Sequence, residues 1–129
     1  MTFRYLLDAS ALLALIQEEP GAHVIEPILE SSCIHTLNLA EVLTKLFQNR
    51  VPDPAKLIQS LQIHALEDFS TSHASACAAL HAATRGHGLS LGDCVCLSRA
   101  EQECLIAVTT ERMWRTAVAG RDIEVLCIR

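Results

Sequence analysis

A short apolar run that ends on a carboxylate lies near the start of the chain: Phe3-Arg4-Tyr5-Leu6-Leu7-Asp8-Ala9-Ser10. The apolar residues predict a buried strand, and the residues rich in Ala and Leu that follow, 10–17, predict a short helix. Asp8 would then lie at the carboxyl end of a parallel strand, where open α/β sheets bind their ligands. Taken alone, an acid at such a place is more often a helix cap.

Predicted strands and helices alternate along the rest of the sequence. Further strands are predicted at 33–36, 63–69, 105–109 and 123–128, and helices at 22–30, 39–47, 54–62, 71–85, 89–102 and 110–117. This alternation predicts an α/β fold of three α/β/α layers, with a central, mainly parallel sheet. The length and the absence of a linker or repeat predict a single domain, residues 1–129.

The composition predicts a compact globular protein, because 50% of the residues are hydrophobic and 19% are charged. The six cysteines form no CxxC pair and lie in apolar or helical stretches. We therefore expect free thiols that act as small core residues in a reducing cytoplasm. We also expect no signal peptide and no membrane span. The net charge of −5 argues against a uniformly basic nucleic-acid surface but leaves room for a local basic rim.

Four acids occupy comparable places in this predicted order. Asp8 follows the first strand, and Glu41 lies one turn into the helix after the second. Asp93 lies in the first turn of a long helix, and Glu111 follows the strand that ends at Thr109. Because the carboxyl ends of parallel strands share one edge of a sheet, we expect these side chains to converge.

Each acid also has a purely structural explanation. Asn38-x-x-Glu41 and Ser90-x-x-Asp93 resemble capping boxes. Asp8 or Ser10 could cap the first helix, and Glu111 could do the same for the helix after Thr110.

Taken together, the four acids favour a metal site. Crowded carboxylates repel one another, and some would be protonated at neutral pH without a cation. Mg²⁺ prefers carboxylate and water oxygens, and Mn²⁺ accepts the same ligands. The scattered histidines do not have zinc-ligand spacing, and the sequence contains no phosphate-binding glycine loop and no GxSxG motif.

Four motifs carry a family resemblance: Leu6-Leu7-Asp8-Ala9-Ser10, Asn38-Leu39-Ala40-Glu41-Val42, Leu89-Ser90-Leu91-Gly92-Asp93-Cys94 and Val108-Thr109-Thr110-Glu111-Arg112-x-Trp114. In this order they resemble the motifs of PIN-domain nucleases. The short chain and its helical middle resemble the VapC toxins of bacterial VapBC toxin–antitoxin modules. The resemblance implies a metal-dependent endoribonuclease that cuts single-stranded or loop RNA, often tRNA or rRNA. It also implies a VapB-type antitoxin as partner and a homodimer.

The resemblance also implies roles for particular residues. Asp8, Glu41 and Asp93 match the three core acids, and Glu111 matches a fourth, where the family more often has Asp. The longer Glu111 side chain suggests a contact through water. Two small hydroxyl residues, Ser10 and Thr109, match positions that often support the site.

The expected chemistry is hydrolysis of an RNA phosphodiester by a metal-activated water. Asp8 and Asp93 would be the main ligands, Glu41 would complete the shell or orient the water, and Glu111 would hold a second ion or an outer water. Arg112 and Arg115, one helical turn apart, are candidates for RNA binding, although the same spacing fits a solvated helix face.

Other interpretations of these residues stay open. Trp114 is more typical of packing than of base stacking. The apolar stripe from Leu39 to Phe47 could be a dimer interface or core. A non-catalytic PIN-like module that binds protein or RNA is the main alternative function. A phosphatase or response-regulator domain using Asp8 lacks the DxDxT pattern and a suitably placed Lys.

Overall fold

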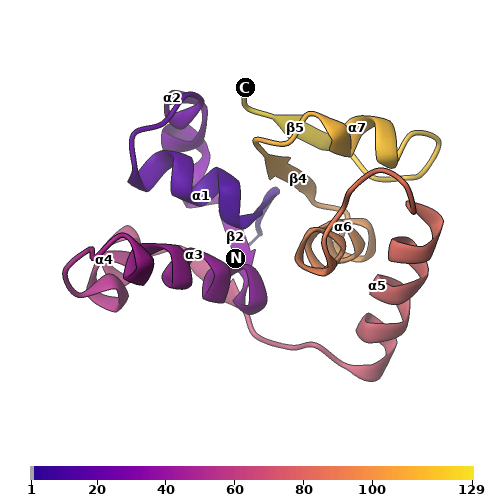
Figure 1. Cartoon of the computed structure of the whole chain (residues 1–129), viewed down its shortest axis with the longest axis horizontal. Coiled ribbons are helices and arrows are strands. Elements are labelled where there is room, and N and C mark those ends of the chain that lie inside the picture. Colours follow the sequence, from indigo (N-terminus) through magenta and orange to yellow (C-terminus); the bar gives the residue numbers. More distant parts are fainter. Residues whose placement is uncertain (1) are drawn as a thin grey trace.

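The computed structural model describes residues 2–129, which form a three-layer α/β/α structure (Figure 1). The strands are β1 (Tyr5–Leu7), β2 (Ser32–His35), β3 (His64–Leu66), β4 (Ile106–Thr109) and β5 (Val125–Cys127). The helices are α1 (Ala9–Ile16), α2 (Ala22–Ile25), the 3₁₀ helix η1 (Glu26–Ser31), α3 (Thr36–Gln48), α4 (Pro54–Leu61), α5 (Thr71–Ala83), α6 (Leu91–Glu103) and α7 (Met113–Ala117). The predicted fold class is confirmed.

The sheet has the strand order β3-β2-β1-β4-β5, and every pair of neighbouring strands is parallel. β1 is central: Leu6 pairs with Cys33 of β2 on one side and with Ala107 of β4 on the other. Because all five strands run the same way, the residues that follow β1, β2 and β4 lie at one edge of the sheet.

Alternate residues of β1 face opposite helical layers. Leu6 packs in a core with α5, α6 and α7, whereas Leu7 packs in a second core with α1, α2 and α3. Figure 1 shows these two groups of helices on either side of the sheet. Both leucines are fully buried, which explains why the strand reads as an uninterrupted apolar run.

Three predicted helices are divided in the structure or differ from it by three or more residues at one end, whereas the bounds of the others differ by one or two residues. The helix predicted at 22–30 is divided into α2 and the 3₁₀ helix η1, because Pro27 lies near the start of η1 and cannot donate a backbone hydrogen bond. α3 begins at Thr36 and is capped by His35, whose Nδ1 accepts the Leu37 N–H at 3.0 Å. α7 begins only at Met113, so Glu111 does not cap it.

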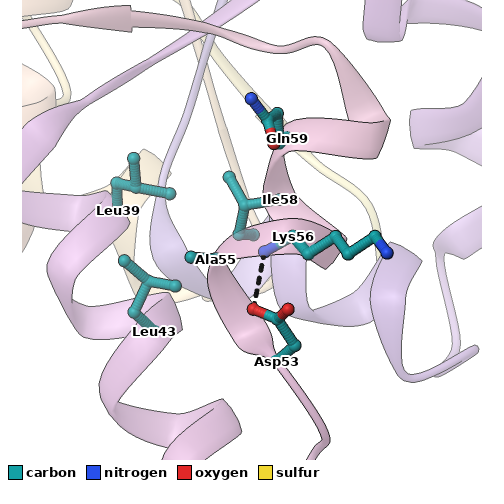
Figure 2. A pocket seen from close by; sticks show the side chains of 7 residues that line it. All are labelled: Leu39, Leu43, Asp53, Ala55, Lys56, Ile58 and Gln59. Carbon is teal, nitrogen blue, oxygen red and sulfur yellow. Dashed lines mark hydrogen bonds between the residues drawn. The ribbon is translucent and has the colours of Figure 1, made fainter.

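The apolar stripe of α3 is split between core and surface. Val42 and Leu46 are fully buried in the core, but Phe47 is 67% exposed. Leu39 and Leu43 are partly buried and face α4 (Figure 2). Part of the stripe therefore lies in the core, whereas Phe47 lies at the surface.

Trp114 is fully buried among core residues, which confirms its predicted packing role. Cys33, Cys77, Cys94 and Cys96 are buried free thiols, as predicted. Cys104 is exposed, contrary to the prediction that every cysteine is a core residue, because it ends α6 in a left-handed conformation at the surface. Within residues 2–129, no helix combines the length and the apolar character needed to cross a membrane.

Candidate active site

Asp8 lies where β1 passes into α1, and its buried carboxylate accepts hydrogen bonds on both oxygens. Oδ1 accepts the Ala11 N–H at 2.8 Å and the Ser10 hydroxyl at 2.7 Å. Oδ2 accepts the Thr109 hydroxyl, also at 2.7 Å. Asp8 thus caps α1, as its structural explanation predicts, and also bonds to the end of β4.

Burial raises the pKa of the Asp8 carboxyl to about 6 from an ordinary 3.8. The hydrogen bonds from Thr109, Ser10 and Ala11 oppose this rise, and the negative charge of Asp93 adds to it. No cationic side chain among residues 2–129 contributes to this shift of the Asp8 pKa. A desolvated carboxylate without a positive partner is unfavourable at neutral pH, and a bound cation would relieve it.

The two hydroxyl groups around Asp8 are themselves held by the backbone after β4. Ser10 Oγ accepts the Thr110 N–H, and Thr109 Oγ1 accepts the Glu111 N–H, each at 3.0 Å. Thr109 is fully buried. These bonds join the ends of β1 and β4 and fix the orientation of both hydroxyls towards Asp8.

Glu41 lies on an exposed face of α3, and its carboxylate is directed towards the start of α6. Asn38 Nδ2 donates to Glu41 Oε1 at 2.8 Å and to the Gly92 carbonyl at 3.1 Å. The predicted capping box of Asn38 and Glu41 is wrong, because α3 starts before Asn38 and His35 is its cap.

Asp93 forms the predicted capping box with Ser90: the Ser90 N–H donates to Asp93 Oδ2 at 2.9 Å, and the Asp93 N–H donates to Ser90 Oγ at 3.1 Å. This role does not remove Asp93 from the site, since its charge still acts on Asp8. Asp93 and Glu111 also share a cavity of about 240 Å³. The lining residues are His87, Gly88, Leu89, Asp93, Glu111, Met113 and Trp114.

Beneath the acids lies Cys96, a fully buried residue of α6. Its pKa is raised well above the ordinary value, first by burial and then by the negative charges of Asp8, Asp93 and Glu41. Three of the four acids therefore act on the same buried thiol. The fourth, Glu111, lines a cavity together with Asp93.

Arg112 and Arg115 are exposed next to Glu111. The Arg115 Nε–H donates to the Val125 carbonyl at 3.4 Å, which leaves the rest of its guanidinium free to meet solvent. Positive charge therefore lies at the surface close in sequence to Glu111, Met113 and Trp114, which line the cavity.

The donor set fits a hard divalent cation in its chemistry, because it consists of carboxylates that include the buried Asp8, which forms no ion pair with a cationic side chain within the described residues. Among residues 2–129, no group of three or more His, Cys, Asp or Glu side chains could hold a metal ion as it stands.

A larger groove, of about 620 Å³, lies between α3 and α4. Figure 2 shows its apolar side chains and the hydrogen bond from the Lys56 N–H to the carboxylate of Asp53, the cap of α4. None of the four acids lines this groove, so it is separate from the acidic site.

The sequence of residues 5–118 matches the PIN domain family. The chain belongs to the PIN domain family. The matched residues include all four acids and the strands β1, β2 and β4. Among curated protein sequences, none matches the chain.

Solved structures with the same fold include PAE2754 from Pyrobaculum aerophilum, at 26% identity and a TM-score of 0.61 over 94% of this chain and 90% of that one. A toxin–antitoxin complex from Klebsiella pneumoniae gives 19% identity and 0.70 over 97% and 98%. A DNA-bound VapBC complex from Salmonella typhimurium gives 15% identity and 0.75 over 99% and 100%. At 19% and 15% identity, the last two similarities show a shared fold.

Sequence reasoning missed the positions of three residues that lie near the predicted acids. Asn38 holds Glu41, Gly92 lies beside the Glu41 carboxylate, and His87 lines the cavity of Asp93 and Glu111. The Asn38 to Glu41 spacing of three residues was the available signal, since residues so spaced share a helix face.

Proposed function

We propose that residues 1–129 act as one PIN domain with the activity of a Mg²⁺-dependent endoribonuclease, the toxin of a type II toxin–antitoxin module. The observation that carries the proposal is the buried Asp8 carboxylate at the carboxyl edge of the sheet, on which the Asp93 charge acts and which has no cationic partner in the described part of the chain, residues 2–129. Membership of a family whose domains are generally nucleases supports it.

In this proposal, Asp8 and Asp93 are the main metal ligands, and Glu41 completes the shell or orients the attacking water. Glu111, which lines a cavity with Asp93, would hold a second ion or an outer water. When bound, Mg²⁺, or Mn²⁺ in its place, lowers the pKa of a coordinated water and offsets charge on the scissile phosphate.

The other residues prepare these acids. Ser10 and Thr109 donate to Asp8 and keep its two oxygens in a fixed orientation. Arg112 and Arg115 attract the RNA phosphates towards a site that is otherwise negative.

We infer the partners from the chains that share the fold. Two of these structures are described as a toxin–antitoxin complex and as VapBC. We propose that a VapB-type antitoxin silences this protein in the cytoplasm, that the protein is a homodimer, and that its substrate is tRNA or rRNA.

The decisive experiment measures cleavage of purified tRNA and rRNA with Mg²⁺, with Mn²⁺ and with EDTA. Asp8→Asn should lower the rate by about 10³-fold, because metal-assisted charge stabilisation supplies several kcal/mol to the transition state. Asp53→Asn is the matched control: it makes the same change at the exposed cap of α4, and the rate should stay at the wild-type level.

Cleavage at the wild-type rate in EDTA or in Asp8→Asn would contradict the proposal. RNA that is bound but never cut, with or without metal, would favour the alternative of a non-catalytic PIN-like module. Growth arrest of a bacterial host on expression, relieved by Asp8→Asn but not by Asp53→Asn, is the expected result for the toxin role.

A further inference from the structure

Asn38 is a buried polar residue whose contacts are not those of a helix cap. Only 1% of its surface is exposed, and it lies within α3, where His35 serves as the cap. Its Nδ2 donates both to Glu41 Oε1 on its own helix and to the Gly92 carbonyl on α6. One amide therefore ties the Glu41 carboxylate to a residue 54 positions away along the chain.

The orientation of this amide is fixed by its partners. A carboxylate oxygen and a carbonyl oxygen both accept hydrogen bonds, so Nδ2, not Oδ1, must face them. As a result, Asn38 Oδ1 is buried without any hydrogen-bond partner among residues 2–129. A buried acceptor without a partner is unfavourable, and an apolar side chain would avoid it. The amide is therefore explained by its two donated bonds and not by packing.

Gly92 leaves the space that the Glu41 carboxylate occupies. A Cβ atom added at Gly92 would lie 2.8 Å from Glu41 Oε2, 2.9 Å from Oε1 and 3.0 Å from Cδ. These contacts are closer than van der Waals packing permits, so any side chain at position 92 would displace the carboxylate. Glycine has a lower helix propensity than alanine, yet here it is the second residue of α6 and immediately precedes Asp93.

The unpartnered Asn38 Oδ1 and the glycine at position 92 are each locally unfavourable. Both residues lie against the same carboxylate, that of Glu41 on an exposed face of α3. Glu41 itself is exposed, so packing alone does not hold its carboxylate. The hydrogen bond from Asn38 and the missing side chain of Gly92 together direct it towards Gly92 at the start of α6, the residue that precedes Asp93 in the sequence.

We propose that Asn38 and Gly92 are positioning residues that hold the Glu41 carboxylate beside Asp93 for metal-dependent RNA cleavage, an inference that rests on the proposed function. Neither residue touches the reacting atoms; both act through Glu41. Residues that orient a ligand in this way typically change metal affinity or activity by about 10- to 100-fold when they are replaced.

The test uses two variants that remove the positioning by different means. Asn38→Leu keeps four side-chain heavy atoms branched at Cγ but removes both N–H donors and the unpartnered oxygen. Gly92→Ala improves helix propensity but pushes the carboxylate away. Each should fold with at least wild-type thermal stability, while Mn²⁺ affinity measured by calorimetry and kcat for RNA cleavage fall about 10- to 100-fold and KM changes little. A structural role would instead lower thermal stability.

A double-mutant cycle with Glu41→Gln separates action through Glu41 from other effects. If both residues act only through the Glu41 carboxylate, Asn38→Leu and Gly92→Ala should cause no further loss in the Glu41→Gln background. Full additivity there, or variants that bind Mn²⁺ and cleave RNA like the wild type, would overturn the positioning role alone. A wild-type protein that neither binds Mn²⁺ nor cleaves RNA would overturn the proposed function and this inference with it.

Discussion

Replacing Asp8 by Asn should stabilise the metal-free protein at neutral pH while it slows RNA cleavage by about 10³-fold. The carboxylate is 4% exposed, and its charged form is disfavoured mainly by burial. Asn is close in shape to the protonated acid. Its carbonyl can still accept from Ser10 and Ala11, and its amide can donate to Thr109 Oγ1.

The expected size follows from the pKa of Asp8. A pKa of about 6 in the folded protein against an ordinary 3.8 corresponds to about 3 kcal/mol at about 1.36 kcal/mol per pH unit. Because the folded-state pKa is raised, the folded protein binds this proton more tightly than the unfolded chain does. The stabilisation is complete below the ordinary pKa and is lost as pH rises through about 6.

At pH 7.5 we therefore expect Asp8→Asn to raise the free energy of unfolding by about 1 to 3 kcal/mol in EDTA, or Tm by about 4 to 12 °C for a chain of this size. Urea unfolding of both proteins at pH 4.5, 6 and 7.5 measures this difference in the free energy of unfolding. The fluorescence of Trp114 reports the transition, since it is the one tryptophan in the sequence and is fully buried.

The difference between wild type and Asp8→Asn should grow as pH rises from 4.5 to 7.5. Asp53→Asn, the matched change at an exposed helix cap, should show no such gain at neutral pH. A difference that is the same at every pH, or an Asp8→Asn protein that is less stable at pH 7.5, would refute the argument that burial of this charge is costly.

Three further predictions follow from the same site and its surroundings. Thr109→Val keeps the side-chain shape but removes a hydrogen bond that lowers the pKa of Asp8, so the pH-dependent loss of metal-free stability should move to higher pH. Arg112→Gln and Arg115→Gln should each weaken RNA binding and reduce the slope of log affinity against log salt by about 1; an unchanged slope would place the RNA elsewhere. A thiol reagent should modify the exposed Cys104 quickly in the folded protein, whereas the buried cysteines, whose raised pKa disfavours the thiolate, should react only after unfolding.

Local patterns were sufficient to predict most elements of the fold. The uninterrupted apolar run before Asp8 predicted a strand buried on both faces, and the structure confirms it with Leu6 in one core and Leu7 in the other. The capping box of Ser90 and Asp93 was also predicted correctly. Both features depend on residues close together in the sequence, where periodicity and cap chemistry act directly.

The errors arose where contacts from elsewhere in the fold, or a single residue within a pattern, changed the local structure. His35 caps α3 and also contacts the Asp68 carbonyl with its other ring nitrogen, at 3.3 Å, so the helix starts before Asn38. This frees the Asn38 side chain to reach Gly92, a contact that spacing within one helix cannot predict. Pro27 interrupted an otherwise helical pattern between 22 and 30.

The sequence by itself determined the alternation of strands and helices, and with it the edge at which the acids after β1, β2 and β4 lie. Only the tertiary structure decided what those acids experience. The pKa of Asp8 depends on burial and on Thr109 and Asp93, which are distant in sequence, and the orientation of Glu41 depends on Asn38 and Gly92. Desolvation and hydrogen bonding act between neighbours in space, so a pattern of residue types places a carboxylate on an element but does not determine its charge or its partners.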